Sequence, residues 1–288
     1  MRRSAGTVFV LSLPWLVSFG AFWLFPLIYS FLIGFTDYQL LKGYNWVGIA
    51  NYVALFSDRE FIESVKNTLI FVVGTIPVTT VIALLLALLV NGRFRGRAVF
   101  RAGYFLPSIT SMVVIALIFT NLYQRGGYIS LLASMAGLRA PEYGFLYDSS
   151  TALYSVMAMD IWMSAGYYML IFLAGLKSIP EELYEAAAIS GAGRIRRFFS
   201  ITLPLLRPVA LYIIVINSIK SFQVFVEIFV MTKGNFDTST MVYFIYDKGL
   251  TTGFRFGYAS AAAYLLFVLI AVVSALQFLV LRKRVGAW

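Results

Sequence analysis

The chain has 288 residues, of which 60% are hydrophobic and only 12% are charged, and its formal net charge is +10. Soluble domains usually carry about 25% charged residues, so this composition predicts an all-α protein embedded in a lipid bilayer. Cysteine and histidine are both absent from the sequence, which excludes disulfides, histidine-based zinc sites and any catalytic triad that needs histidine.

The first two predicted spans cover 7–36 and 67–92, and neither contains a charged residue. Each is longer than the about 20 apolar residues that a spanning helix needs. The first follows a basic start at Arg2 and Arg3, as in a signal peptide. Its apolar run exceeds the usual 7 to 15 residues of a signal peptide, so we predict a retained span.

The third span is predicted at 102–124 and contains Pro107, with Tyr104 and Ser108 on either side of it. A proline inside a helix frees a carbonyl group and is expected to kink the span. Irregular backbone at membrane depth is tolerated only where it is buried in protein or faces water. Pro107 therefore indicates a segment inside the bundle or beside an aqueous path.

Charged residues interrupt the fourth and fifth spans, predicted at 150–176 and 206–232. Asp160 lies in the fourth, and Lys220 and Glu227 lie seven residues apart in the fifth, which predicts one shared helix face. A charge inside a span costs about 2.5 to 3.5 kcal/mol on insertion scales. Two interpretations stay open: an ion pair that fixes packing, or the polar wall of a translocation cavity.

The loop at 178–204 separates these two spans and contains its own helix pattern. Ser178 followed by Glu181 predicts a capped helix start, and Gly191 is placed to end the helix. A second short helix is expected over 194–200. From the residues alone, the loop is either an amphipathic helix at the lipid headgroups or a docking element for a soluble partner.

The sixth span, 256–281, is free of charge, and basic residues gather in alternate loops. Fourteen of the 23 basic residues lie in four segments: Arg2 and Arg3; Arg93, Arg95, Arg97 and Arg101; Lys177, Arg194, Arg196, Arg197 and Arg207; and Arg282, Lys283 and Arg284. The other three loops hold seven: Lys42, Arg59, Arg125, Arg139, Lys233, Lys248 and Arg255. Because basic loops stay in the cytoplasm, we predict six spans with both termini in the cytoplasm. The charge thus reflects topology, and no nucleic-acid partner is predicted.

One set of residues resembles a known family. Glu185, Ala186 and Ala187, then Gly191, then Ile201, Leu203 and Pro204 fit the spacing E-A-A-x₃-G-x₉-I-x-L-P. This spacing is similar to the signature loop of permease subunits of binding-protein-dependent ABC importers. Segments such as "RGRAVFRAGYFLPSI" and "FGYASAAAYLLF" resemble the carbohydrate-uptake branch, with its maltose-type and glycerol-phosphate-type permeases. Ser190 replaces the usual aspartate, and the stretch after the fifth span lacks the branch's Thr-x-Gly-Gly-Pro.

The resemblance implies a type I ABC importer permease of a prokaryotic inner membrane, with 1–288 forming one transmembrane domain. It implies that the helix carrying Glu185, Ala186 and Ala187, ended by Gly191, is a coupling helix that docks on a cytoplasmic ATPase. The implied partners are two copies of that ATPase, which bind the ATP and magnesium, a second homologous permease and an extracytoplasmic solute-binding protein. No cofactor, metal or catalytic residue is expected in this chain itself.

The same resemblance implies a set of residues along the substrate pathway. Tyr104, Ser108, Ser164, Tyr167, Ser221 and Gln223 match positions that line the sugar site of the maltose-type permease. Aromatic rings, hydroxyls and amides are the groups that bind sugars. The alternative is that these side chains merely pack one span against another.

The loop, the charges inside the spans and the lack of histidine and cysteine bear on three functions. A sugar importer subunit accounts for the loop, and the sequence lacks the phosphate-binding G-x-x-x-x-G-K-[ST] motif, so ATP hydrolysis falls to another chain. An ion-coupled secondary transporter would use Asp160, Lys220 and Glu227 as its relay. An integral membrane enzyme would need a catalytic constellation that is hard to assemble without histidine or cysteine.

Overall fold

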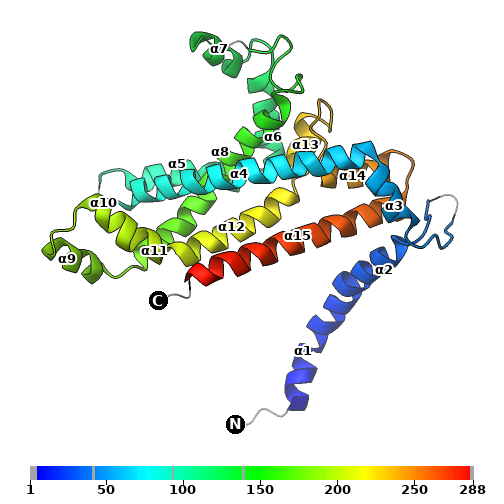
Figure 1. The fold of residues 1–288 in the computed structure, drawn as a ribbon, viewed down its shortest axis with the longest axis horizontal. Coiled ribbons are helices and arrows are strands. Elements are labelled where there is room, and N and C mark those ends of the chain that lie inside the picture. The colour runs from blue at the N-terminus through cyan, green and yellow to red at the C-terminus, as the bar shows by residue number, and fades with distance from the viewer. Residues whose placement is uncertain (1–4, 41–42, 93, 138–139, 286–288) are drawn as a thin grey trace. The chain divides into compact units, whose positions relative to one another are not determined.

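The structure is a computed structural model that describes residues 5–40, 43–92, 94–137 and 140–285, and helices joined by loops make up this part (Figure 1). Within these ranges no β-strand forms, only isolated bridges. Among the described residues, four helices are long and apolar enough to cross a membrane, and two bent helix pairs raise the number to six if each pair is one span. The predicted all-α fold is confirmed. Some of the basic residues used for topology lie outside the described residues: Arg2, Arg3, Lys42, Arg93 and Arg139, and the side chains of Arg282, Lys283 and Arg284.

The chain divides into two compact units, and the first comprises residues 1–62 and 244–267. Its helical elements are α1 (Ala5–Phe19), a π-helical turn (Gly20–Leu24), α2 (Phe25–Ile33), α3 (Ala50–Ser57) and a second π-helical turn (Asp247–Thr251). Three helices continue across its boundaries: α4 (Arg59–Asn91), α14 (Met241–Tyr246) and α15 (Phe256–Val285).

Polar contacts hold the segment after α3 against the segment that leads into α15. The ammonium of Lys248 lies 2.5 Å from a carboxylate oxygen of Glu60, and the Tyr258 hydroxyl donates a hydrogen bond of 2.6 Å to Asp58. Burial lowers the pKa of Lys248, but the hydrogen bond and charge of Glu60 and the charge of Asp247 raise this pKa more. The net direction is upward, so the folded state favours the charged lysine.

The second unit comprises residues 63–243 and 268–288 and contains the loop and the charged residues singled out above. Its membrane-length or bent segments are α5 (Arg97–Ile109), α6 (Met112–Tyr123), α8 (Ala152–Lys177) and α12 (Arg207–Phe222). Its shorter elements are α7 (Tyr128–Met135), α9 (Glu181–Ile189), α10 (Arg194–Arg197), a π-helical turn (Phe198–Thr202), α11 (Leu203–Leu205) and α13 (Val226–Met231).

Helix α8 is the buried element of this second unit. Its apolar side chains are spread around the whole helix, and buried residues occur along it from Ala152 to Leu176. A helix without a polar face is stable only when neighbours surround it. One apolar cluster joins its Met159 to Phe71 of α4, and another joins its Phe172 to Ile213 of α12. These helices carry the site described below.

Two predicted spans are broken rather than continuous. Helices α5 and α6 meet at a bend of 97°, at Thr110 and Ser111. The predicted kink thus occurs just after the turn that contains Pro107, because Thr110 adopts an extended backbone with ψ 149°. The fifth span is helical only to Phe222 and resumes at Val226. The prediction that Lys220 and Glu227 share one helix face is wrong, since this break separates them.

Candidate functional site

An ion-pair network joins α8 to α12. The ammonium of Lys220 donates hydrogen bonds of 2.9 Å to Asp160 Oδ1 and 2.6 Å to Ser164 Oγ, and the Ser164 hydroxyl donates 3.3 Å to the same carboxylate oxygen. The side chain of Asp160 is 3% exposed, whereas that of Lys220 is 41% exposed. The negative charge of Asp160 is therefore neutralised inside the protein by Lys220, while the Lys220 side chain also reaches an open space.

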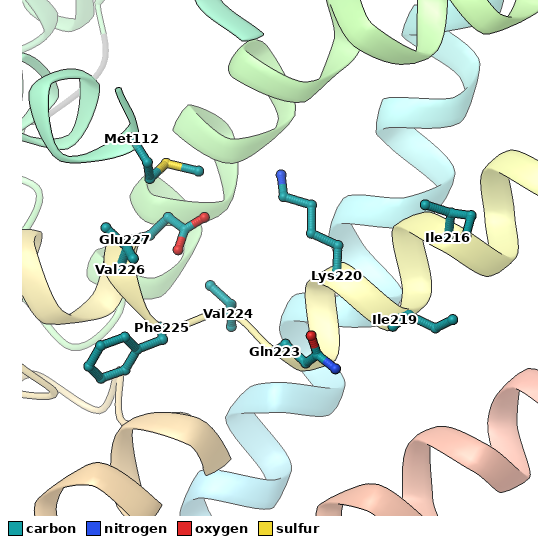
Figure 2. A pocket seen from close by; sticks show the side chains of 9 residues that line it. All are labelled: Met112, Ile216, Ile219, Lys220, Gln223, Val224, Phe225, Val226 and Glu227. Carbon is teal, nitrogen blue, oxygen red and sulfur yellow. The ribbon is translucent and has the colours of Figure 1, made fainter. Parts of the chain in front are cut away.

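That space is a cavity of about 440 Å³, between the end of α12, the start of α13 and the start of α6. Its polar lining residues are Lys220, Gln223 and Glu227, and its apolar ones are Met112, Ile216, Ile219, Val224, Phe225 and Val226. Figure 2 shows the side chains of Lys220 and Glu227 extending into the same space from the two sides of the helix break. Glu227 itself is 5% exposed. The break at 223–225 is what turns these groups toward one cavity.

A second part of the candidate site is the crossing of α5 and α8, which run in opposite directions. The Ser108 hydroxyl donates 3.1 Å to the carbonyl of Met163. A Cβ atom added at Gly166 would overlap the carbonyl oxygen of Tyr104 and lie 2.6 Å from its carbonyl carbon. The glycine thus lets the two backbones touch, so the part of α5 with Tyr104 and Ser108 lies against Met163 and Gly166 of α8. Ser164 instead contacts Asp160 and Lys220, and the ring of Tyr167 packs edge-on against Tyr168.

The remaining two predicted pathway residues separate. Ser221 is buried, and its hydroxyl lies 3.3 Å from that of Thr75 on α4, away from the cavity. Gln223 is exposed and lines the cavity. The structure therefore groups Gln223 with Lys220 and Glu227, and it gives Ser221 an interhelical contact instead.

The loop at 178–204 forms two helical segments. Gly191 ends α9, as predicted: its φ is +77°, and the amides of Gly191 and Ala192 bond the carbonyls of Ala188 and Ala187 at 3.0 and 2.9 Å. The predicted cap at the other end is wrong. The Ser178 hydroxyl donates to Gly175 in the last turn of α8 instead, because Pro180 takes the position before α9.

The second helical segment of the loop is longer than predicted, running from Arg194 to Leu205. The hydroxyl groups of Tyr184 and Thr202 lie 2.9 Å apart and fasten α9 to this segment. With Tyr184 turned inward, Glu185 and Ala186 are exposed on α9. Sequence reasoning missed this link, which depends on the return of the chain, and it missed Gly166, whose role appears only once α5 is in place.

In the part of the chain that the structure describes, no group of three or more acidic side chains lies close enough to hold a metal ion. The arrangement instead offers hydroxyl, amide, ammonium and carboxylate groups around an apolar-walled space. Such a lining suits a polar organic solute.

Known proteins share this architecture. The family described as "Binding-protein-dependent transport system inner membrane component" matches residues 79–286. The probable ABC transporter permease protein YesP of Bacillus subtilis is 32% identical, over 96% of this chain and 89% of that protein. The arabinooligosaccharides transport system permease protein AraP of the same species is 33% identical, over 92% and 85%. The crystal structure of a bacterial alginate ABC transporter, in complex with its alginate-bound periplasmic protein, contains a chain that is 26% identical. The match has a TM-score of 0.84 and covers 97% of this chain and 95% of that one.

Proposed function

This chain belongs to the family of binding-protein-dependent transport system inner membrane components, and from that premise we propose that it forms part of the import path for a sugar or related polar solute. The observation that carries the proposal is that proteins named as transport permeases match more than nine-tenths of the chain, 96% and 92% in two cases. The solutes named for the relatives, arabinooligosaccharides and alginate, support a carbohydrate.

The proposal assigns energy supply and solute delivery to other polypeptides. Two copies of a cytoplasmic ATPase bind ATP and magnesium, a second permease completes the path, and an extracytoplasmic protein delivers the solute. The periplasmic protein in the alginate transporter structure supports the last of these partners. Because basic loops stay in the cytoplasm, both termini and α9 lie on the cytoplasmic side of the inner membrane.

Helix α9 is the proposed docking element. Glu185 and Ala186 are exposed on it, Ala187 is half-buried, and Gly191 fixes its end. Because Tyr184 is tied to Thr202, the exposed face of α9 is held in one orientation. The small residues beside the Glu185 carboxylate suit close approach by a partner that supplies a basic residue.

The proposed solute path passes the crossing of α5 and α8 and the cavity next to it. Tyr104 and Ser108 lie at the crossing, Ser164 contacts Lys220 beside the cavity, and Gln223 lines the cavity. Tyr167 is the residue after Gly166 on α8. The alternative of a secondary transporter needs Lys220 as part of an ion relay. The structure weakens this alternative, because Lys220 is held by Asp160 and Ser164.

Charge reversal on α9 tests the docking assignment. We expect Glu185→Lys to weaken copurification with the ATPase, or to uncouple ATP hydrolysis from solute uptake, while membrane insertion is unchanged. Glu182→Lys is the matched control, because Glu182 is also exposed on α9 but lies in its first turn. Normal ATP-driven uptake by Glu185→Lys would contradict docking through this residue. Uptake by the purified chain without any ATPase would contradict the proposed function as a whole.

A further inference from the structure

The cavity beside Lys220 has more acidic than basic groups around it. Among the described residues that line it, Lys220 is the one basic side chain and Glu227 the one acidic side chain. Directly behind Lys220 lies the carboxylate of Asp160, 2.9 Å from the ammonium. Counting Asp160 with the lining, the cavity has one cation and two carboxyl groups.

The ammonium of Lys220 already has two hydrogen-bond partners in the protein. It has three N–H donors, and two of them point to Asp160 and Ser164 at 2.9 and 2.6 Å. The third can donate to a solute hydroxyl. The positive charge itself is balanced by Asp160, which is 2% exposed and therefore little screened by water.

Glu227 adds no positive charge to the cavity in either protonation state. Ionised, its carboxylate repels an anion. Protonated, it is a neutral donor and acceptor. The other polar lining group, the amide of Gln223, is neutral and offers both donors and an acceptor.

On these grounds we propose that the cavity accepts an uncharged polyhydroxy group and rejects carboxylate and phosphate groups, and that Asp160 sets this preference by neutralising Lys220. The inference deepens the proposed function, on which it rests. It assigns this importer to neutral sugars, unlike the transporter for alginate, an acidic polysaccharide, that it resembles. Hydroxyls would bond Gln223 and the third Lys220 proton, and a sugar's C–H face would pack on Phe225.

The cysteine-free sequence permits a direct test. In a Gln223→Cys variant of the assembled importer, the new thiol reacts with two small methanethiosulfonates, one bearing trimethylammonium and one bearing sulfonate. Each rate is divided by the rate with a free thiol, so that the ratio reports the potential inside the cavity. An Ile216→Cys variant repeats the measurement on another wall of the same cavity.

We expect the normalised rate of the anionic reagent to be no higher than that of the cationic one. A unit charge about 6 Å away, at an effective dielectric constant near 20, changes local reagent concentration by about 100-fold. Adding Asp160→Asn releases the Lys220 charge and should shift the ratio toward the anionic reagent by about tenfold or more. Adding Lys220→Met instead should shift the ratio the opposite way.

Inorganic phosphate completes the test as a competitor. It should slow labelling of the Gln223→Cys variant that also carries Asp160→Asn, and leave labelling of Gln223→Cys unchanged when Asp160 is present. A preference for the anionic reagent with Asp160 intact, phosphate protection in that same variant, or no shift in either charge variant would overturn the inference. These labelling rates are measured without transport. A result that overturns the inference would therefore leave the proposed function standing. Loss of ATP-dependent uptake in the parent importer would count against the function instead.

Discussion

Replacing Gly166 by alanine tests whether the contact of α5 with α8 is as close as the structure has it. The added Cβ would lie 2.6 Å from the carbonyl carbon of Tyr104 and 3.1 Å from Cα of Phe105. Ordinary carbon contacts are about 3.5 to 4.0 Å, so the two backbones must separate by about 1 Å. Both obstacles are main-chain atoms, which cannot move aside as a side-chain end can. Overpacking of this kind costs about 1–3 kcal/mol.

Gly103→Ala is the matched control for this change. Gly103 also lies inside a helix, α5, but an added Cβ there meets nothing within 4 Å. Both substitutions reduce the freedom of the unfolded chain equally and raise helix propensity by up to about 1 kcal/mol. The difference between the two variants therefore isolates the clash.

The assay is the midpoint of thermal unfolding of the purified importer, with solute uptake as a second readout. We expect Gly166→Ala to be about 1–3 kcal/mol less stable than Gly103→Ala and to lose uptake, because the crossing holds the proposed pathway residues. Equal midpoints and equal uptake in the two variants would show that α5 and α8 do not approach this closely.

Three further changes probe other parts of the structure. Lys220→Met leaves Asp160 buried without its cation and should lower stability by about 1–3 kcal/mol, below the about 3–5 kcal/mol of fully buried pairs because 41% of the lysine side chain is exposed; thermal unfolding measures it. Gly191→Ala places a β-carbon at φ +77°, should cost about 1–2 kcal/mol, and should speed amide exchange in the last turn of α9. Lys248 has a raised pKa, so its pairing with Glu60 stabilises the protein below the ordinary value of 10.5 and is lost as pH rises beyond it; Lys248→Met should flatten this alkaline loss of thermal stability.

Each of these changes has a control. For the ion pair, Asp160→Leu combined with Lys220→Met should recover part of the lost stability, since no buried charge is left unpaired. For the glycine, Gly193→Ala should leave exchange unchanged, because its φ is −68° and an added Cβ meets nothing within 4 Å. A stability profile of Lys248→Met that falls with alkaline pH as steeply as the parent's would contradict the assignment to this lysine.

Apolar periodicity predicts the helices of this chain well but not the places where they break. The residues on both sides of 223–225 include neither glycine nor proline, so nothing in their sequence marks the end of α12 at Phe222. Spacing counted along an unbroken helix then assigned Lys220 to the same face as Glu227. The partner that the structure provides, Asp160, lies 60 residues away, and pairing across that distance depends on which spans are neighbours.

Local rules succeeded where one residue decides the geometry and failed where two helix ends compete. Gly191 ends α9 because the left-handed conformation favours glycine, and this is readable from the sequence. Ser178 matched the pattern of a helix start equally well. Its hydroxyl instead bonds Gly175 in the preceding helix, an acceptor that is available only because α8 extends through Lys177. The roles of the docking and pathway residues stay predictions that the experiments above address.

The hydroxyl contact between Tyr184 and Thr202 has a mechanical consequence. Thr202 belongs to the segment Arg194–Leu205, which leads through a bend of 59° into α12. The 16 residues of α12 form a stiff rod of about 24 Å with Lys220 near its far end. We therefore expect a displacement of α9 to pass through Thr202 and this bend into α12, and so to Lys220. We expect that Thr202→Val, which removes one of the two hydroxyls, leaves both helices folded but loosens the coupling between them, measured as less solute uptake for each ATP hydrolysed.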